Sequence, residues 1–147
     1  MDIPDPYGGS LDAYRAAARL IERGVRRLYV EDALRRASLA GVQPSSHLSG
    51  IFNRAAKECE KEVAAFVLRD LQQAVHGKAT LGQLATAIST YATLNSRPDL
   101  AELSAAVVAV NDVWVKVKHR VDPPAEDLVQ GLTAIRRLFE LFEQQTA

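Results

Sequence analysis

The chain has 147 residues, of which 18 are Lys or Arg and 18 are Asp or Glu, so its formal net charge is zero. A neutral chain is not a general polyanion binder, because affinity for a phosphate backbone needs an excess of cations. The single cysteine, Cys59, excludes an intramolecular disulfide framework. The longest apolar runs are far shorter than the roughly 20 residues that span a bilayer, and the N-terminus lacks the pattern of a secretory signal. We therefore expect a cytoplasmic protein of one domain that does not contact the membrane.

Residues 1–9 predict an irregular, extended arm, because two of the six prolines and two of the eight glycines lie there. Residues 10–40 predict a first helical unit with Ser10 as its N-cap. Its apolar residues recur at alternating steps of three and four, which places the arginines of this segment elsewhere on the helix. These seam residues are Leu11, Tyr14, Ala18, Ile21, Val25 and Leu28. The stripe then drifts toward Tyr29 and Ala33, which is consistent with a bend, and Gly41 and Pro44 end the unit.

Residues 45–147 predict the main helical bundle. A helix that begins at Ser45 or Ser46 keeps one apolar face as far as Leu71, and His76–Gly77 predicts its end. Thr80 caps a shorter helix, which ends before a turn at residues 95–98.

The next predicted helix has the most regular pattern in the chain. Its apolar residues alternate by three and four without a break from Leu100 to Val121, which favours a central, buried helix. Asp122–Pro124 interrupts it, and Pro124 is suited to the first position of a last helix. No segment competes as a strand, so we expect an all-α fold, a bundle of five or six helices with an irregular N-terminal arm.

The arm and the start of the first helix carry an Asp5-Pro6-Tyr7 motif followed by helical residues as far as Leu28. Residues 2–28 resemble the C-terminal end of low-molecular-weight protein-tyrosine phosphatases, in which such a D-P-Y segment precedes the last helix. The resemblance implies that Asp5 matches the general acid and Tyr7 the aromatic residue of that family. The family also needs a Cys-x5-Arg loop, whereas the sixth residue after Cys59 is Ala65 and carboxylates flank the cysteine. An acid without its nucleophile predicts no phosphatase turnover.

Arg69 and His76 fit the loose R-x4–6-H pattern of HEPN-type helical ribonucleases. In such a site, histidine acts as general base on a ribose hydroxyl and arginine neutralises the developing phosphorane charge. The alternative interpretation is an exposed arginine and a histidine near a helix C-terminus, where a cation complements the helix dipole.

Arginines spaced four residues apart predict a ridge along the first helix. The ridge consists of Arg15, Arg19, Arg23 and Arg27, with Arg26 beside it. Such a row of guanidinium groups can bind phosphates or acidic helices. The alternative interpretation is a helix face exposed to solvent. Residues 10–40 carry a net charge of +3 and residues 122–147 a net charge of −3, so we expect the two ends to pack together, within one chain or between subunits.

Neither metal-ligand spacing nor a phosphate-binding glycine motif occurs, so we expect no metal, no cofactor and no catalytic residues beyond the alternatives above. The leading hypothesis is a non-enzymatic helical-bundle protein that acts through protein–protein contacts as an adaptor, regulator or assembly subunit. We expect homodimerisation through the arm and first helix, with anchors at Tyr7, Tyr14 and Tyr29 and with the arginine ridge. The alternative is an RNA-directed protein, either a HEPN-like ribonuclease or a small subunit that binds RNA through the ridge.

Overall fold

A computed structural model describes residues 10–39, 45–120 and 123–145, and this part of the chain is helical without any strand. Its elements are α1 (Leu11–Leu39), α2 (Ser45–Ala65), the π-helical turn η1 (Phe66–Asp70), α3 (Leu81–Leu94), α4 (Pro98–Val117) and α5 (Ala125–Gln145). The predicted all-α bundle is confirmed, and α1 is one continuous helix. The arm expected at residues 1–9 lies outside the described residues.

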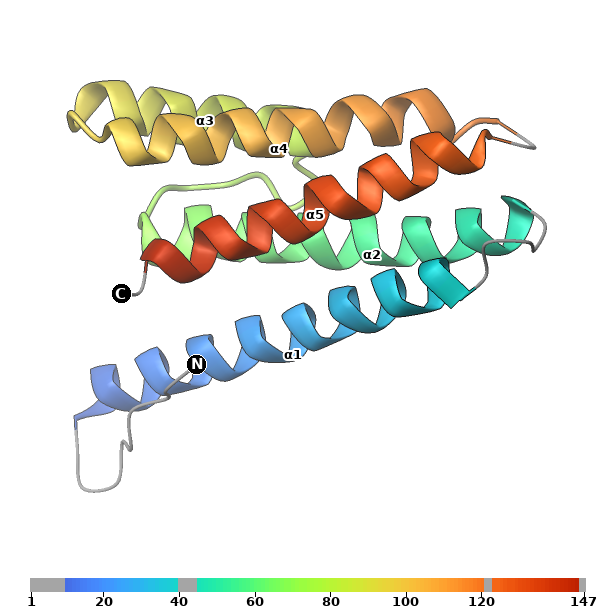
Figure 1. Ribbon diagram of the computed structural model, residues 1–147. Helices are drawn as coiled ribbons and strands as arrows, with labels where there is room; N and C mark the ends of the chain where they lie inside the picture. The colour runs from blue at the N-terminus through green and yellow to red at the C-terminus, as the bar shows by residue number, and fades with distance from the viewer. Residues whose placement is uncertain (1–9, 40–44, 121–122, 146–147) are drawn as a thin grey trace.

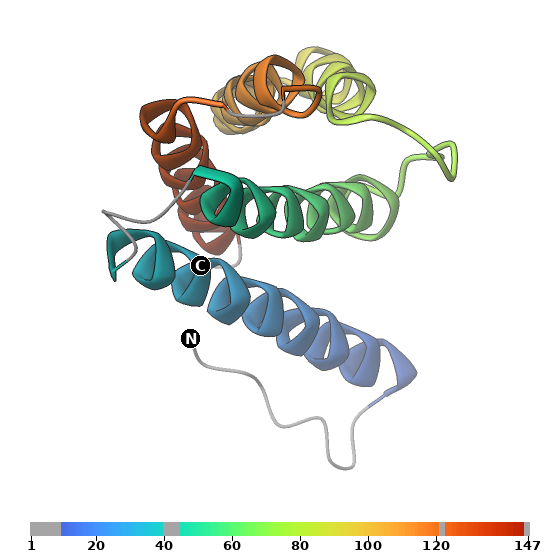
Figure 2. The same ribbon diagram turned by 90° about the vertical axis from the view of Figure 1, so that its right-hand side faces the viewer.

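The helices lie in three layers (Figures 1 and 2). α3 and α4 form one layer, α2 and α5 the next, and α1 lies on the far side of α2 and α5. α1 packs against α2 and α5, α3 packs chiefly against α4, and α4 also packs against α5. α1 therefore covers one side of a bundle that the other four helices build.

Local sequence sets the helix ends. The Ser10 hydroxyl accepts a hydrogen bond from the Ala13 backbone N–H at 3.3 Å, and Thr80 caps the start of α3, as the sequence predicts. Gln83 completes a reciprocal capping box with Thr80. The stop expected at His76–Gly77 is wrong, because the helical backbone ends at Asp70. Gln72 adopts a left-handed conformation with φ 54°, which interrupts the helix before the histidine.

The core belongs to the four helices α2 to α5. The α4 seam from Leu100 to Val110 is buried against α3 and α5, as predicted. The prediction of a central helix is wrong, because α4 lies in an outer layer (Figure 1) and Val108 and Val115 are exposed. Large aromatic side chains of α2 and α5 such as Phe52 and Phe139 are buried. By contrast, within residues 11–36 of α1 the buried hydrophobic residues are Ala17, Val30 and Ala33, and Leu34 packs against the core in a partly buried position. Since complete burial of a valine contributes only about 1.5–3 kcal/mol, apolar packing alone holds α1 weakly.

None of the described helices combines the length and the low polarity that crossing a bilayer requires.

Gly131 permits α5 to approach α2 and α4 closely. A Cβ at this position would overlap the Phe52 ring and lie 2.9 Å from Val113 Cγ1. We expect Gly131→Ala to lower the free energy of unfolding by about 1–3 kcal/mol despite the better helix propensity of alanine. Gly50→Ala is the matched control, because a Cβ added at Gly50 on α2 would have no other atom within 4 Å; urea denaturation should show it stabilised by up to about 1 kcal/mol. Equal effects of the two substitutions would contradict this packing.

Candidate functional site

Three arginines of α1 face the bundle. Arg23 is 2% exposed and Arg19 is also buried, while Arg26 is mostly buried beside them. Opposite them lie Glu62 of α2 and Asp70 of η1. The structure thus places the middle of the predicted arginine ridge in an intramolecular contact.

Glu62 is the centre of this contact. Its carboxylate is fully buried and accepts four hydrogen bonds from three guanidinium groups. Arg19 binds both carboxylate oxygens, at 2.9 and 2.7 Å, and Arg23 Nε and Arg26 Nη1 donate at 2.9 and 2.7 Å. Bidentate, charge-assisted bonds of this kind are the strong ones in proteins, so they fix the rotation of α1 about its axis.

Asp70 completes the contact through the π turn. Arg23 Nη2 donates to Asp70 Oδ2 at 2.6 Å, and Arg19 Nε lies 3.4 Å from Oδ1. In a regular α-helix, two residues eight positions apart differ by about 80° in direction. The π turn, closed by the bond from Leu71 N–H to Phe66 O at 3.0 Å, takes up about one extra residue and brings Asp70 to within about 20° of Glu62.

The sequence contains a signal for this network, which is a charged residue inside an apolar stripe. A search for apolar residues alone does not find it. The buried stripe of α2 continues into η1, and Glu62 occupies one of its positions. The stripe alternates by three and four over Phe52, Ala55, Cys59, Glu62 and Phe66. A charge inside an apolar stripe needs a buried counter-ion. The arginines of residues 10–40 are the candidates that could have been paired with it.

The network shifts the pKa values of Glu62 and Arg19. Burial alone would raise the pKa of Glu62, but the hydrogen bonds and charges of Arg19, Arg23 and Arg26 outweigh it and hold the pKa below its ordinary value of 4.5. Burial alone would lower the pKa of Arg19, but its bonds and charge interactions with Glu62 and Asp70 raise it. Both groups are therefore charged at neutral pH.

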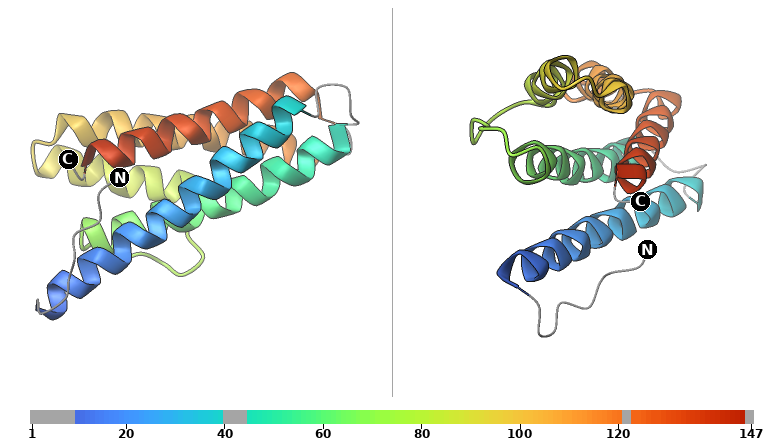
Figure 3. Two further views of the ribbon diagram at one scale, coloured as in Figure 1. Left: turned by 60° about the horizontal axis from the view of Figure 1, so that its bottom comes forward. Right: turned by 90° about the vertical axis from the view of Figure 1, so that its left-hand side faces the viewer.

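The opposite face of α1 is apolar and exposed. The predicted seam lies there, with Leu11 63%, Val25 61% and Leu28 71% exposed. Tyr14, Ile21 and Tyr29 are also exposed on this helix. The two panels of Figure 3 show α1 as the outermost helix on its side of the bundle. α1 therefore has its charged side inward and its apolar side outward.

α1 also contacts α5 through charges. Arg27 Nη1 lies 2.8 Å from Glu143, and Arg136 Nε lies 3.3 Å from Glu31. Arg23 donates to the Phe142 carbonyl at 3.2 Å and lies over the Phe142 ring. The expectation that the basic and acidic ends of the chain pack together is confirmed within one chain.

Some of the remaining residues of the predicted interaction surface are exposed, and others lie outside the described residues. Tyr14 is exposed, and Arg15 is exposed with Asp12 4.0 Å away. Tyr7 and the phosphatase-like Asp5 lie outside the described residues. The phosphatase resemblance stays a prediction.

Arg69 and His76 lie on different segments and have different hydrogen-bond partners. Arg69 is on η1 and donates to Glu22 of α1 at 2.6 Å. His76 is exposed in the segment after η1, and its Nδ1 accepts a hydrogen bond from the Lys78 N–H at 3.1 Å. Within the described ranges, no hydrogen bond joins the two side chains, so the ribonuclease alternative gains no geometric support.

Cys59 is fully buried. Burial, together with the charges of Glu62 and Glu60, raises the pKa of its thiol, so the thiolate that a nucleophile requires does not form at neutral pH. Of the two carboxylates that flank the cysteine in the sequence, Glu60 contributes to this shift.

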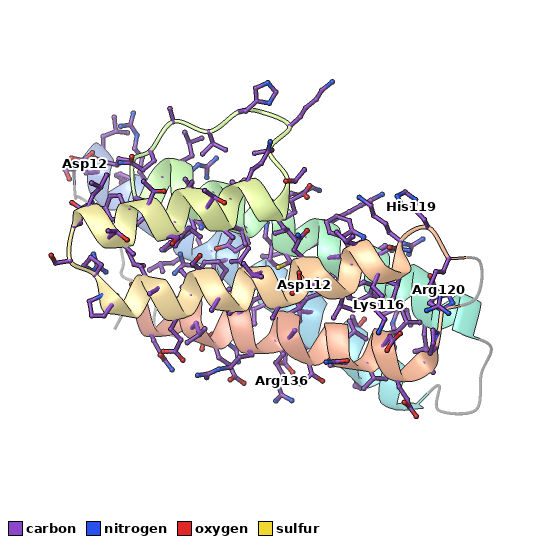
Figure 4. All side chains as sticks on the ribbon, turned by 90° about the horizontal axis from the view of Figure 1, so that it is seen from above. Asp12, Asp112, Lys116, His119, Arg120 and Arg136 are labelled. Carbon is purple, nitrogen blue, oxygen red and sulfur yellow. The ribbon has the colours of Figure 1, made fainter. Side chains whose placement is uncertain are left out.

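The basic residues near the end of α4 gather at one end of the molecule, away from Asp12 (Figure 4). Lys116 and Arg120 lie 3.4 and 4.0 Å from Asp127 in the first turn of α5. This cluster therefore joins the ends of two helices.

A surface cavity of about 1050 Å³ opens between the N-terminal half of α1, η1 and the ends of α3 and α5. Its lining includes the exposed arginines Arg15, Arg69 and Arg97. Each of them lies within 4.0 Å of a carboxylate, those of Asp12, Glu22 and Asp99 respectively. The charges of the cavity wall are thus balanced within the chain.

Comparison of the chain with models of protein families, with curated proteins and with solved structures gave no match.

The network predicts a large effect of Glu62→Gln. Removing this charge leaves Arg19 and Arg23 buried without their main counter-ion, so we expect a loss of about 3–5 kcal/mol in the free energy of unfolding. Urea denaturation measures it. The control is Glu102→Gln, an exposed carboxylate 3.0 Å from Arg137, which should change stability little. Similar small losses for both variants would contradict the central role of Glu62.

The pH dependence follows from the lowered pKa of Glu62. Its contribution to stability is fully present above its ordinary pKa of 4.5 and is lost as the pH falls through the lower pKa of the folded state. We expect the stability gap between the wild type and Glu62→Gln to narrow as the pH falls below the ordinary pKa of 4.5 toward the lower pKa of the folded state. The other charged groups of the network are present in both proteins, so their titration contributes equally to both. These groups are Asp70, Glu22, Glu58 and the facing arginines. A gap that stays constant over this range would contradict the assignment.

Proposed function

We propose that this protein is a non-enzymatic interaction protein, an adaptor, regulator or assembly subunit, whose contact surface is the outer face of α1. The observation that carries the proposal is the orientation of α1, with a seam of large apolar side chains exposed along its outer side. A contiguous apolar strip on a folded domain is typical of a protein contact site. The cytoplasmic location expected from the sequence is part of the proposal.

The proposed first partner is a second copy of the chain. The seam steps by three and four over Leu11 to Leu28, and such spacing is typical of a helix that pairs with another helix. A two-fold symmetric contact uses the same strip from each copy and is the commonest arrangement of homo-oligomers. Tyr14 and Tyr29 supply aromatic rings of the kind enriched at interfaces.

The size of the strip suits a reversible dimer. Covering the exposed half or more of a Leu, Ile or Val side chain contributes about 1 kcal/mol, or on the order of 10 kcal/mol for the strips of both copies. Association costs about 4–15 kcal/mol. Against the lowest of these costs the gain leaves about 6 kcal/mol, so we expect a weak, reversible dimer with a dissociation constant of about 40 μM.

The arginine ridge supports the RNA-binding alternative less well. Three of its guanidinium groups, those of Arg19, Arg23 and Arg26, donate to carboxylates of the same chain. Phosphate contacts would have to break these bonds, so the apolar strip is the stronger feature.

Sedimentation equilibrium tests the proposal. We expect a monomer–dimer equilibrium that Leu28→Glu abolishes, because the substitution places a carboxylate inside the strip. The matched control is Val115→Glu, since Val115 is 57% exposed on α4; it should leave the equilibrium unchanged. A wild type that stays monomeric at about 100 μM, or a control that dissociates the dimer equally, would refute the proposed contact. Circular dichroism verifies that both variants keep their helices.

A further inference from the structure

We infer that two copies pair through the outer faces of α1 in antiparallel orientation. The inference rests on the proposed function and adds the geometry of the contact. The two-fold axis would cross α1 at the midpoint between Leu11 and Leu28, near residues 19 and 20. The four-helix body of each copy would then lie on opposite sides of the helix pair, because the strip faces away from α2 and α5.

Side-chain size favours this orientation. In an antiparallel pair, Leu11 lies opposite the partner's Leu28, Tyr14 opposite the partner's Val25, and Ala18 opposite the partner's Ile21. Each layer then combines residues whose sizes fill the space between the helices. A parallel pair would place Ala18 opposite its own copy, which leaves a gap, and Tyr14 opposite its own copy, which crowds the next layer.

The charges beside the strip favour the same orientation. Arg15 is exposed, and its ion pair with Asp12 is long, at 4.0 Å. In an antiparallel pair, residues on the same flank meet across the axis, so Arg15 lies near the partner's Glu22, and Glu22 near the partner's Arg15. A parallel pair would bring Arg15 near the partner's Ser10 and Glu22 near the partner's Ala17, without a charge pair. Two symmetric ion pairs therefore accompany the antiparallel contact.

Glu22 links this contact to the interior of the protein. Its oxygens lie 2.7 Å from Arg26 Nη2 and 2.6 Å from Arg69 Nη1, and Arg26 itself binds Glu62. The flank that would meet the partner's Arg15 is thus held in place by the same network that orients α1.

A spin-label distance tests the orientation without altering the strip. Ser10→Cys places the label just before α1, and the native Cys59 is fully buried and will not react. In the antiparallel dimer the two labels lie about 30 Å apart along the pair, since each residue adds about 1.5 Å. In a parallel dimer they lie about one interhelix distance apart, roughly 10 Å before the length of the labels is added. Pulsed electron paramagnetic resonance distinguishes the two.

Disulfide exchange gives an independent test. Leu11→Cys and Leu28→Cys are mixed in equal amounts, at a protein concentration above the dissociation constant, and should form a disulfide-linked dimer in oxidising buffer. Neither variant alone should do so, because the two copies of the same position are about 25 Å apart in the antiparallel pair. Crosslinking of each variant with itself, or a short label distance, would overturn the orientation and leave the proposed dimer intact. A monomer by sedimentation in the wild type would overturn both.

Arg15→Glu adds a charge test. It brings a carboxylate close to the partner's Glu22 in the antiparallel pair and should raise the dissociation constant several-fold at low salt, with less effect at high salt. Arg35→Glu is the control, since Arg35 is an exposed residue of α1 beyond the strip. No difference between the two variants would count against the proposed flank pairs.

Discussion

The fold of this protein depends on the neutralisation of one buried carboxylate. Glu62 projects from the buried face of α2, where an unpaired charge would cost several kcal/mol. Arg19, Arg23 and Arg26 of α1 supply the opposite charge with short hydrogen bonds. Because these arginines lie on one side of α1, pairing them with Glu62 decides which side of the helix faces the bundle. The apolar seam on the other side is consequently exposed, and the proposed contact surface is a result of an interior electrostatic requirement.

The network between α1 and Glu62 links the stability of the monomer to the proposed association of two copies. Buried ion pairs add little net stability compared with apolar packing, yet losing one partner is costly, so the network acts mainly on orientation. α1 adds few buried apolar side chains to the core. Under the proposed function, covering its outer strip by a partner would add apolar burial on the side that the monomer leaves exposed. The helix would then be held from both sides, by charges within the chain and by apolar contacts between chains.

The sequence predicted the class of the fold and much of its local detail. The caps at Ser10 and Thr80 and the buried α4 seam follow from short-range rules that act within one helix. The end of the second helix was misplaced: the helical backbone ends at Asp70 and Gln72 is left-handed. Asp70 contacts Arg19 and Arg23 of α1, far away in the sequence, and the apolar pattern carries no information about such a contact. The apolar pattern also could not predict which side of α1 faces the bundle, because that side is set by contacts with other helices. A seam of apolar residues ordinarily faces the core, and only the position of Glu62 inside the α2 stripe indicates that the arginines would turn inward instead.

The central claim is that Glu62 and the α1 arginines act as one coupled unit that orients the helix. A double-mutant cycle between Arg23→Leu and Glu62→Leu, followed by urea denaturation at neutral pH, measures that coupling most directly. We predict that each single variant is clearly destabilised and that the double variant loses less than the two losses together, with a coupling of about 1–3 kcal/mol. Additive losses, with a coupling near zero, would contradict the claim.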